Sequence, residues 1–178
     1  MTTSKQSGPP IQSLTGFRLR KHPDYQAAYS RSRKHQSASM SWFLAPRPVS
    51  PTGADAEAFS AETSSGIPGP RVGLTAGKVL GKAHERNRIK RRMREALRRH
   101  ADLLPHGESL TADLILHPRR TVLTMDFAKL EAEIVRILNQ ARAELIRAET
   151  QARAELARAE AQARAGQART DAQAHKQA

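Results

Sequence analysis

The chain has 178 residues and a formal net charge of +13 at pH 7, with 30 Lys and Arg against 17 Asp and Glu. It has no cysteine, which excludes a disulfide framework, a thiolate zinc site and cysteine catalysis. Hydrophobic residues make up 38% of it, less than in most globular domains, so we expect one small core with part of the chain outside it. No apolar run is long enough to span a bilayer and no signal peptide opens the chain, so we expect a cytoplasmic protein.

The first element that the sequence predicts is a helix over residues 20–30, which follows a polar, flexible arm over residues 1–16. Pro23 fits the first turn of this helix, because the nitrogen at that position needs no hydrogen-bond partner. Tyr25 and Tyr29 are four residues apart, so their rings share one face of the helix.

Two strands and a loop are predicted before the most basic segment. Residues 39–45 carry several large apolar groups, as strands do, whereas residues 49–70 are rich in Pro, Gly, Ser and Ala, which indicates a loop insertion. A second strand is expected at residues 71–75 and a basic helix at residues 82–100. The apolar run DLILH predicts a short buried strand at residues 113–117.

The last helix is predicted to begin after Asp126, whose carboxylate suits the N-cap position. From residue 141 the chain repeats every eleven residues, and its Ala, Glu, Arg and Gln are strong helix formers. We expect residues 141–178 to form a solvated helix that frays after Gly166; the alternative is a partner-binding coil, for which large apolar residues are few. Before this tail, apolar residues at helical spacing give the helix a core-facing side: Phe127, Leu130, Ile134, Ile137 and Leu138.

The predicted basic helix carries most of the positive charge. Residues 71–100 hold eleven Lys or Arg and two Glu, a local net charge of +9. At about 100° per residue, the helix has one narrow apolar stripe, formed by Ile89, Met93, Ala96 and Leu97. Solvated faces usually mix both signs of charge, whereas the rest of this helix has almost no acid, which favours a polyanionic partner such as nucleic-acid phosphate. Five arginines are predicted to point away from the stripe: Arg88, Arg91, Arg92, Arg98 and Arg99.

The string GKAHERNRIKRRMREALRR resembles the signature of the bacterial ribonuclease P protein subunit, a family whose hallmark is the sequence Arg-Asn-Arg, here Arg86, Asn87 and Arg88. Three other segments are similar to the family in the same order: RLRKHPDYQAAYSRSRK with its tyrosine pair, RVGLTAGKVLGKA before the basic helix, and DLILHPRR for the last strand. The resemblance indicates an RNA-binding domain over residues 17–140, with the loop insertion inside it, followed by the repeat tail.

The resemblance implies an α+β or α/β sandwich ordered α-β-β-β-α-β-α, with a left-handed β-α-β crossover and, in this chain, a long C-terminal helical extension. It implies the accessory protein of an endoribonuclease, which binds the catalytic RNA and the 5′ leader of precursor tRNA. In the family the RNA subunit holds the Mg²⁺ ions and cuts the leader from the tRNA. We therefore expect no metal on the protein alone, and neither a membrane nor DNA as a partner.

The family's roles carry over to residues that match its motifs. The basic helix of the family binds the catalytic RNA, which here indicates Arg86, Asn87, Arg88, Lys90, Arg91, Arg92 and Arg94. The leader-binding positions correspond to Tyr25, Tyr29 and Lys78, with Arg18 and Lys21 adding charge beside them. Three further aromatic residues are interpreted as core, with a base-stacking role as the alternative: Phe17, Trp42 and Phe43.

Other classes of function remain open from the residues alone. A basic RNA-binding assembly protein similar to a ribosomal protein explains the charge, but not the ordered set of tyrosine pair, strand, turn and Arg-Asn-Arg helix. A coiled-coil scaffold built by the tail is a third reading. The seven His show no metal-ligand spacing with one another or with a carboxylate, and no nucleophile lies near a base, so a protein-only nuclease is disfavoured.

Overall fold

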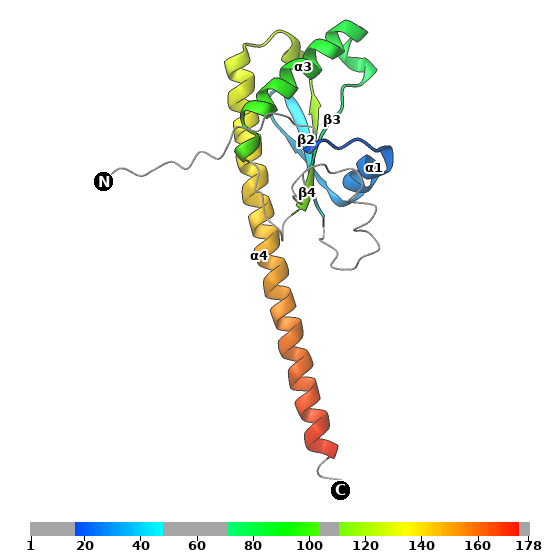
Figure 1. The fold of residues 1–178 in the computed structure, drawn as a ribbon, viewed down its shortest axis with the longest axis vertical. Coiled ribbons are helices and arrows are strands. Elements are labelled where there is room, and N and C mark those ends of the chain that lie inside the picture. Colours follow the sequence, from blue (N-terminus) through cyan, green and yellow to red (C-terminus); the bar gives the residue numbers. More distant parts are fainter. Residues whose placement is uncertain (1–16, 48–70, 104–110, 175–178) are drawn as a thin grey trace, which may run out of the picture. The chain divides into compact units, whose positions relative to one another are not determined.

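The computed structural model describes residues 17–47, 71–103 and 111–174, so the predicted arm and loop insertion lie outside the described residues. Three short 3₁₀ turns accompany the main elements: η2 (Lys78–Leu80), η3 (Ala101–Leu103) and η4 (Arg120–Leu123). The predicted order α-β-β-β-α-β-α is confirmed (Figure 1). In chain order the elements are α1 (His22–Arg31), β1 (Arg33–Gln36), β2 (Met40–Arg47), β3 (Arg71–Leu74), α3 (Ala83–Arg99), β4 (Thr111–Pro118) and α4 (Phe127–Ala174).

The four strands form one mixed sheet in the order β1-β2-β4-β3. β2 pairs antiparallel with both β1 and β4, whereas β3 runs parallel to β4 and is joined to it through α3. β1, with the sequence RKHQ, has no apolar alternation, and the sequence therefore does not locate it. It forms an edge of the sheet, where polar and charged side chains are common.

One face of the sheet carries the main core, under α3 and the first part of α4 (Figure 1). Successive strand residues alternate between faces, so Met40, Trp42 and Leu44 of β2 point to this side together. The predicted stripe of α3 is confirmed, because all four of its residues are buried in this core. α4 contributes Leu130, Ile134, Ile137, Leu138, Ala141 and Leu145.

The opposite face of the sheet packs against α1 through a smaller apolar cluster. Leu19, Ala28, Ala45 and Ile115 are its buried members. Tyr25, Tyr29 and Phe43 pack against this cluster and are only partly buried. This thin cover leaves aromatic edges accessible on the α1 side, whereas the α3 and α4 side is closed.

A buried carboxylate joins the β1–β2 turn to α4. Glu133 is 8% exposed and accepts hydrogen bonds from the Ser39 amide at 2.9 Å and the Ser39 hydroxyl at 2.6 Å. The Ser37 hydroxyl donates to the same carboxylate. Burial alone would raise the pKa of Glu133, but these hydrogen bonds to the charged form outweigh it and hold the pKa below its ordinary value.

A second polar cluster fixes the start of β3. Arg71 makes a two-pronged pair with Asp113 of β4, at 2.8 Å from Nε and 3.1 Å from Nη2. Its remaining terminal nitrogen lies 3.1 Å from Asp24 of α1. Asp113 is 1% exposed, so its charge needs this partner. The cluster ties α1, β3 and β4 together on the side of the sheet that carries the tyrosine pair.

The predicted cap of the last helix is confirmed: the Asp126 carboxylate accepts hydrogen bonds from the amides of Ala128 and Lys129 at 2.8 and 3.3 Å. The predicted long helical extension is also confirmed, since α4 continues to Ala174. The helix runs past Gly166 to Ala174, and fraying of this last stretch in solution stays a prediction. A glycine in a helix interior costs about 1 kcal/mol relative to alanine.

The chain divides into two units, Met1–Leu145 and Ile146–Ala178. In the second unit every residue from 150 to 165 is exposed, and Glu149 and Arg153 form an i,i+4 ion pair at 2.9 Å. Leu156 is 62% exposed. No helix among the described residues is long and apolar enough to cross a membrane.

Candidate RNA-binding surface

The basic helix α3 begins with a fixed geometry. The Lys82 amide donates to the Glu85 carboxylate at 2.7 Å, which satisfies one of the free N–H groups of the first turn. Gly81 precedes this contact with φ of +119°, a conformation that favours glycine. A Cβ at Gly81 would lie 2.2 Å from the Glu85 carboxylate, so a larger residue here would also displace this side chain from the Lys82 amide.

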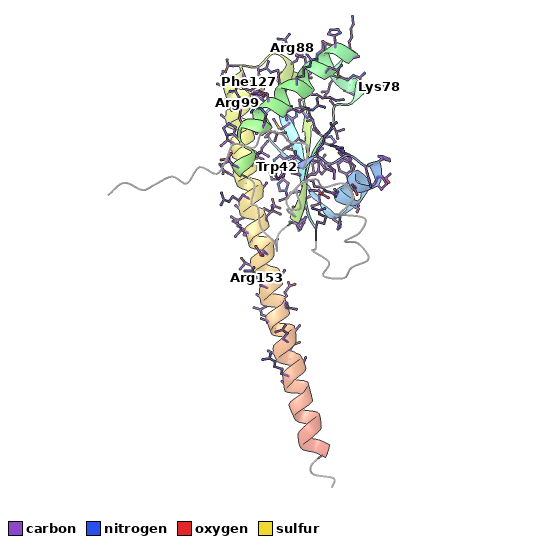
Figure 2. The ribbon with its side chains drawn as sticks, viewed as in Figure 1. Trp42, Lys78, Arg88, Arg99, Phe127 and Arg153 are labelled. Carbon is purple, nitrogen blue, oxygen red and sulfur yellow. The ribbon has the colours of Figure 1, made fainter. Side chains whose placement is uncertain are left out.

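The outer face of α3 carries two residues of the Arg-Asn-Arg sequence, Asn87 and Arg88, and exposed arginines that follow them. Asn87, Arg88, Arg91 and Arg94 are exposed, and Figure 2 shows Arg88 on α3 with Lys78 on the turn before the helix. Arg86 and Lys90 are half-buried beside the apolar stripe. Among the residues that the structure describes, these five cations have no ion-pair partner: Arg86, Arg88, Lys90, Arg91 and Arg94.

Arg92 differs from the other arginines of α3. It is half-buried, and its guanidinium donates to the carbonyl of Leu123 at 3.1 Å and to the carbonyl of Met125. The prediction that Arg92 points away from the core side is therefore wrong. Residue 92 lies on the flank of the stripe, and its long side chain reaches the segment that joins β4 to α4. We assign Arg92 a structural role and leave it out of the candidate RNA surface.

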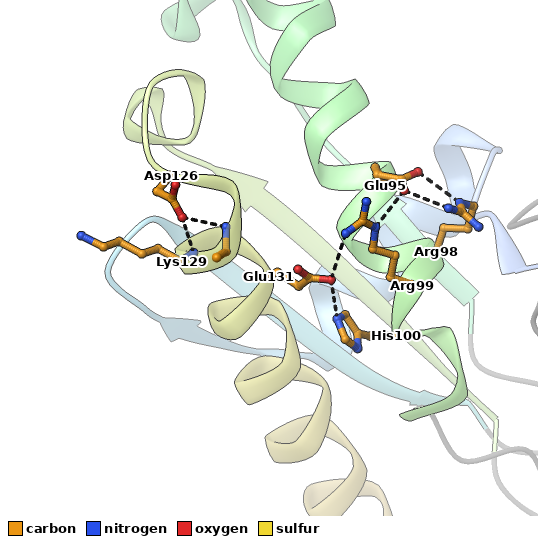
Figure 3. A network of polar contacts seen from close by, with 8 residues as sticks. Glu95, Arg98, Arg99, His100, Asp126, Lys129 and Glu131 are labelled. Atoms are coloured by element: carbon orange, nitrogen blue, oxygen red, sulfur yellow. Dashed lines mark hydrogen bonds and ion pairs between the residues drawn. The ribbon is translucent and has the colours of Figure 1, made fainter. Parts of the chain in front are cut away.

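The C-terminal end of α3 is held by charges within the protein (Figure 3). Arg98 and Arg99 both pair with Glu95, at 2.8 and 2.9 Å, and these hydrogen bonds lower the pKa of Glu95 to about 2. His100 and Arg99 also reach Glu131 of α4, at 2.9 and 3.6 Å. In the described part of the chain, the cations of α3 that have no ion-pair partner therefore lie between Arg86 and Arg94, before this paired end.

A second candidate site lies on the α1 side of the sheet. The rings of Tyr25 and Tyr29 are 6.4 Å apart, and Phe43 meets Tyr29 edge to face at 5.1 Å. The Tyr29 hydroxyl lies 2.7 Å from Nε2 of His117 on β4. Burial lowers the pKa of His117, with a smaller contribution from the nearby charge of Lys34. Burial also raises the pKa of Tyr25, so this residue is a neutral phenol at pH 7.

Gly73 of β3 explains how the first tyrosine ring lies so close to the sheet. A Cβ at this position would lie 2.7 Å from Cε1 of Tyr25 and 2.9 Å from its hydroxyl. The Tyr25 hydroxyl then donates to the carbonyl of Leu19 at 3.3 Å. These contacts fix the ring against β3 and leave it only partly buried.

The remaining predicted leader residues lie at the surface. Lys78 is exposed on η2, and Arg18 and Lys21 are exposed before α1. Of the aromatic residues, Trp42 is buried and stacks on His35 at 4.0 Å on the side away from the tyrosines, which confirms it as core. Phe43 is half-buried beside Tyr29, so it belongs to the tyrosine site. Phe43 follows Trp42 in β2, and successive strand residues point to opposite faces of the sheet. The sequence position of Phe43 could therefore have placed it on the face of the tyrosines.

Two partners of the tyrosine site had no sequence signal. His117 and Thr75 lie far from α1 in the sequence, yet both reach the Tyr29 hydroxyl, Thr75 at 3.5 Å. Over the described ranges, no group of three or more His, Asp or Glu is arranged to hold a metal ion.

Sequence comparison supports one family. The family model described as Ribonuclease P matches residues 15–142. A ribonuclease P protein component from Cyanothece sp. is 32% identical over 126 residues, which is 70% of this chain and 92% of the relative. The corresponding protein of Chloroflexus aggregans is 46% identical over 76 residues, which is 41% of this chain and 52% of the relative.

Solved structures agree on the fold. The ribonuclease P protein of Thermotoga maritima matches with a TM-score of 0.50 and 22% identity, covering 69% of this chain and 96% of that one. A mutant ribonuclease P protein of Staphylococcus aureus also gives a TM-score of 0.50, with 21% identity over 71% of this chain and 88% of that one. The family match ends at residue 142, so most of the repeat tail lies outside it. The ordered elements, the Arg-Asn-Arg helix and these matches together show that the chain belongs to the ribonuclease P protein family.

Proposed function

We propose that this chain is the protein subunit of ribonuclease P and that it binds the catalytic RNA through the outer face of α3. The observation that carries the proposal is the set of five cations of α3, between Arg86 and Arg94, that have no ion-pair partner among the described residues. An apolar stripe anchors the opposite side of this helix in the core, so the cations are presented on a rigid element. Neutralising RNA phosphates releases condensed counterions, which makes such a surface favourable for a folded RNA.

The tyrosine site is proposed to hold the single-stranded 5′ leader of precursor tRNA. Partly open aromatic rings let unpaired bases stack, at about 1–3 kcal/mol per base. Tyr25 and Tyr29 are fixed by hydrogen bonds through their hydroxyls, so their ring orientation is set before RNA arrives. Lys78, Arg18 and Lys21 supply positive charge for the leader phosphates.

In this proposal the protein positions RNA and the RNA subunit does the chemistry. The catalytic RNA would hold the Mg²⁺ ions and cut the phosphodiester that joins the leader to the mature 5′ end of the tRNA. Two buried carboxylates, Asp113 and Glu133, are engaged by Arg71 and Ser39 and are not free to act as bases. The chain's part is to bind and orient both RNAs.

The α3 assignment is tested by measuring binding of the full chain to the catalytic RNA over a range of salt. The double variant Arg86→Ala and Arg88→Ala should bind more weakly, and its salt slope should be shallower by about 0.7–0.9 for each phosphate that is no longer neutralised. The double variant Arg153→Ala and Arg158→Ala removes the same charge from the second unit and should change neither quantity. Equal effects of the two double variants would show that only overall charge matters.

The tyrosine assignment is tested with two substrates, a precursor tRNA with a long leader and a tRNA without one. Replacing Tyr25 and Tyr29 with alanine should weaken binding of the long-leader substrate to the reconstituted complex by about tenfold or more. The leaderless tRNA should bind as before. Equal losses for both substrates would show that the rings only support packing of α1.

The competing assignment is a basic assembly protein that binds RNA without taking part in cleavage. It predicts tight binding to ribosomal RNA and no change in cleavage when the chain is added to the catalytic RNA. The ordered tyrosine site on the opposite side of the sheet from α3 favours the first proposal, since an assembly protein has no need of it.

A further inference from the structure

The η4 turn runs along α3 and is attached to it at two points. At one end, Nη2 of Arg120 lies 3.0 Å from the Glu85 carboxylate. At the other end, Arg92 of α3 donates to the carbonyls of Leu123 and Met125. Glu85 and Arg92 are seven residues apart, so η4 follows one side of α3 for about two helical turns.

Arg88, the second arginine of the Arg-Asn-Arg sequence, lies on this same side of α3. Residues three, four and seven apart share a face of a helix, and Glu85, Arg88 and Arg92 have this spacing. Arg88 therefore lies between the two attachment points of η4. The Arg120 guanidinium, which pairs with Glu85, is on one side of it, and the carbonyls that accept from Arg92 are on the other. η4 becomes an edge of the cationic surface rather than a separate loop.

The exposure of the Arg120 pair shows which group faces outward. The Arg120 side chain is 66% exposed, whereas the Glu85 side chain is 18% exposed. One Glu85 oxygen accepts from the Lys82 amide and the other from Arg120. Arg120 thus covers the one acid in the first part of α3 and still has further N–H donors directed to solvent, because a guanidinium has five.

Because the Arg120 side chain is largely exposed and solvent screens the charges, this ion pair adds little to stability. Its effect on a phosphate partner is larger, since an uncovered Glu85 would repel phosphates that approach Arg88. On this basis we propose that Arg120 is an additional contact to the catalytic RNA, which holds one stretch of phosphate backbone together with Arg88. This inference rests on the proposed role of α3 as the surface that binds the catalytic RNA.

The test compares Arg120→Ala with Arg153→Ala, a closely matched control. Arg153 is 72% exposed and pairs with Glu149 at 2.9 Å, so both substitutions remove an exposed arginine from an ion pair with glutamate. Binding of the full chain to the catalytic RNA is measured as a function of salt. Arg120→Ala should weaken binding severalfold and lower the salt slope by about 0.7–0.9. Arg153→Ala should leave both unchanged, and Arg120→Lys should keep most of the slope.

The Arg88→Ala variant separates failure of this inference from failure of the proposed function. If Arg88→Ala lowers the salt slope but Arg120→Ala gives the same slope and affinity as the Arg153→Ala control, the contact by Arg120 is refuted. The proposal that α3 binds the catalytic RNA is then still supported. If neither Arg88→Ala nor Arg120→Ala changes the slope, the α3 surface itself is refuted, and the inference with it. Circular dichroism of each variant confirms that the helices are intact.

Discussion

Two neighbouring arginines of α3 should have opposite roles, although they look alike in the sequence. Arg91 is exposed without an ion-pair partner in the described part of the chain, whereas Arg92 donates to the carbonyls of Leu123 and Met125. We predict that Arg92→Ala destabilises the fold and leaves the salt slope of RNA binding intact. Arg91→Ala should do the reverse.

The magnitudes follow from the contacts. A hydrogen bond that involves a charged group contributes about 1.5–3 kcal/mol, and Arg92 is only half-buried, so we take the lower end for each of its two bonds. Arg92→Ala should then cost about 3 kcal/mol, which lowers Tm by about 6–12 °C for a chain of this size. A substitution of an exposed residue, such as Arg91→Ala, should change the free energy of unfolding by no more than about 0.5 kcal/mol. Its cost appears as a salt slope that is shallower by about 0.7–0.9.

The assay uses the chain's single tryptophan, Trp42, which is 2% exposed in the main core and so reports unfolding of that unit alone. Urea unfolding followed by tryptophan fluorescence gives the free energy of unfolding, and RNA titrations at several salt concentrations give the slope. A stable Arg92→Ala variant with a reduced slope would show that this guanidinium faces the RNA, and would refute the division of roles on α3.

Three further predictions concern the fold and the tail. Asp113→Asn should lower the free energy of unfolding in urea by about 2–4 kcal/mol, because it leaves the charge of Arg71 without its buried partner. Asp24→Asn should lower it by under about 1 kcal/mol, because the Asp24 carboxylate is 31% exposed. Similar losses for both variants would show that burial of the carboxylate does not matter here. The pKa of Glu133 is lower in the folded state than in the unfolded chain, so its contribution to stability is present above the unfolded value of 4.5 and is lost as pH falls through the folded value. In the Glu133→Gln variant, the free energy of unfolding should therefore fall less steeply as pH decreases below about pH 5. The same steepness in the variant and the original chain would show that the pKa of Glu133 is not lowered by folding. Removing the chain beyond Leu145 should leave cleavage of precursor tRNA by the reconstituted complex unchanged, and loss of cleavage would favour a scaffold role for the tail.

Local patterns in the sequence predict part of this molecule well. The stripe of α3 follows from periodicity alone, because a helix that packs on a sheet must place its apolar residues every three or four positions. The Asp126 cap follows equally from local chemistry, since its carboxylate reaches amides only two and three residues away. The tyrosine pair on α1 follows from its four-residue spacing.

Contacts between distant segments are what the sequence does not show. The direction of Arg92 depends on carbonyls about thirty residues away, which no helical pattern encodes. The contact of Tyr29 with His117 joins residues 88 apart, and Ser39 with Glu133 joins residues 94 apart. The sequence does not predict β1, because the residues of this polar edge strand do not alternate between apolar and polar. The resemblance to the family supplies the order of the elements, but not these contacts.

Cleavage of precursor tRNA by the catalytic RNA of ribonuclease P, with and without the purified chain, tests the central claim most directly. At low Mg²⁺, where the RNA alone is slow, we predict that the full chain restores release of the 5′ leader and that the Arg86→Ala and Arg88→Ala double variant does so poorly. A correctly folded chain that leaves the cleavage rate unchanged at every Mg²⁺ and salt concentration would contradict the account.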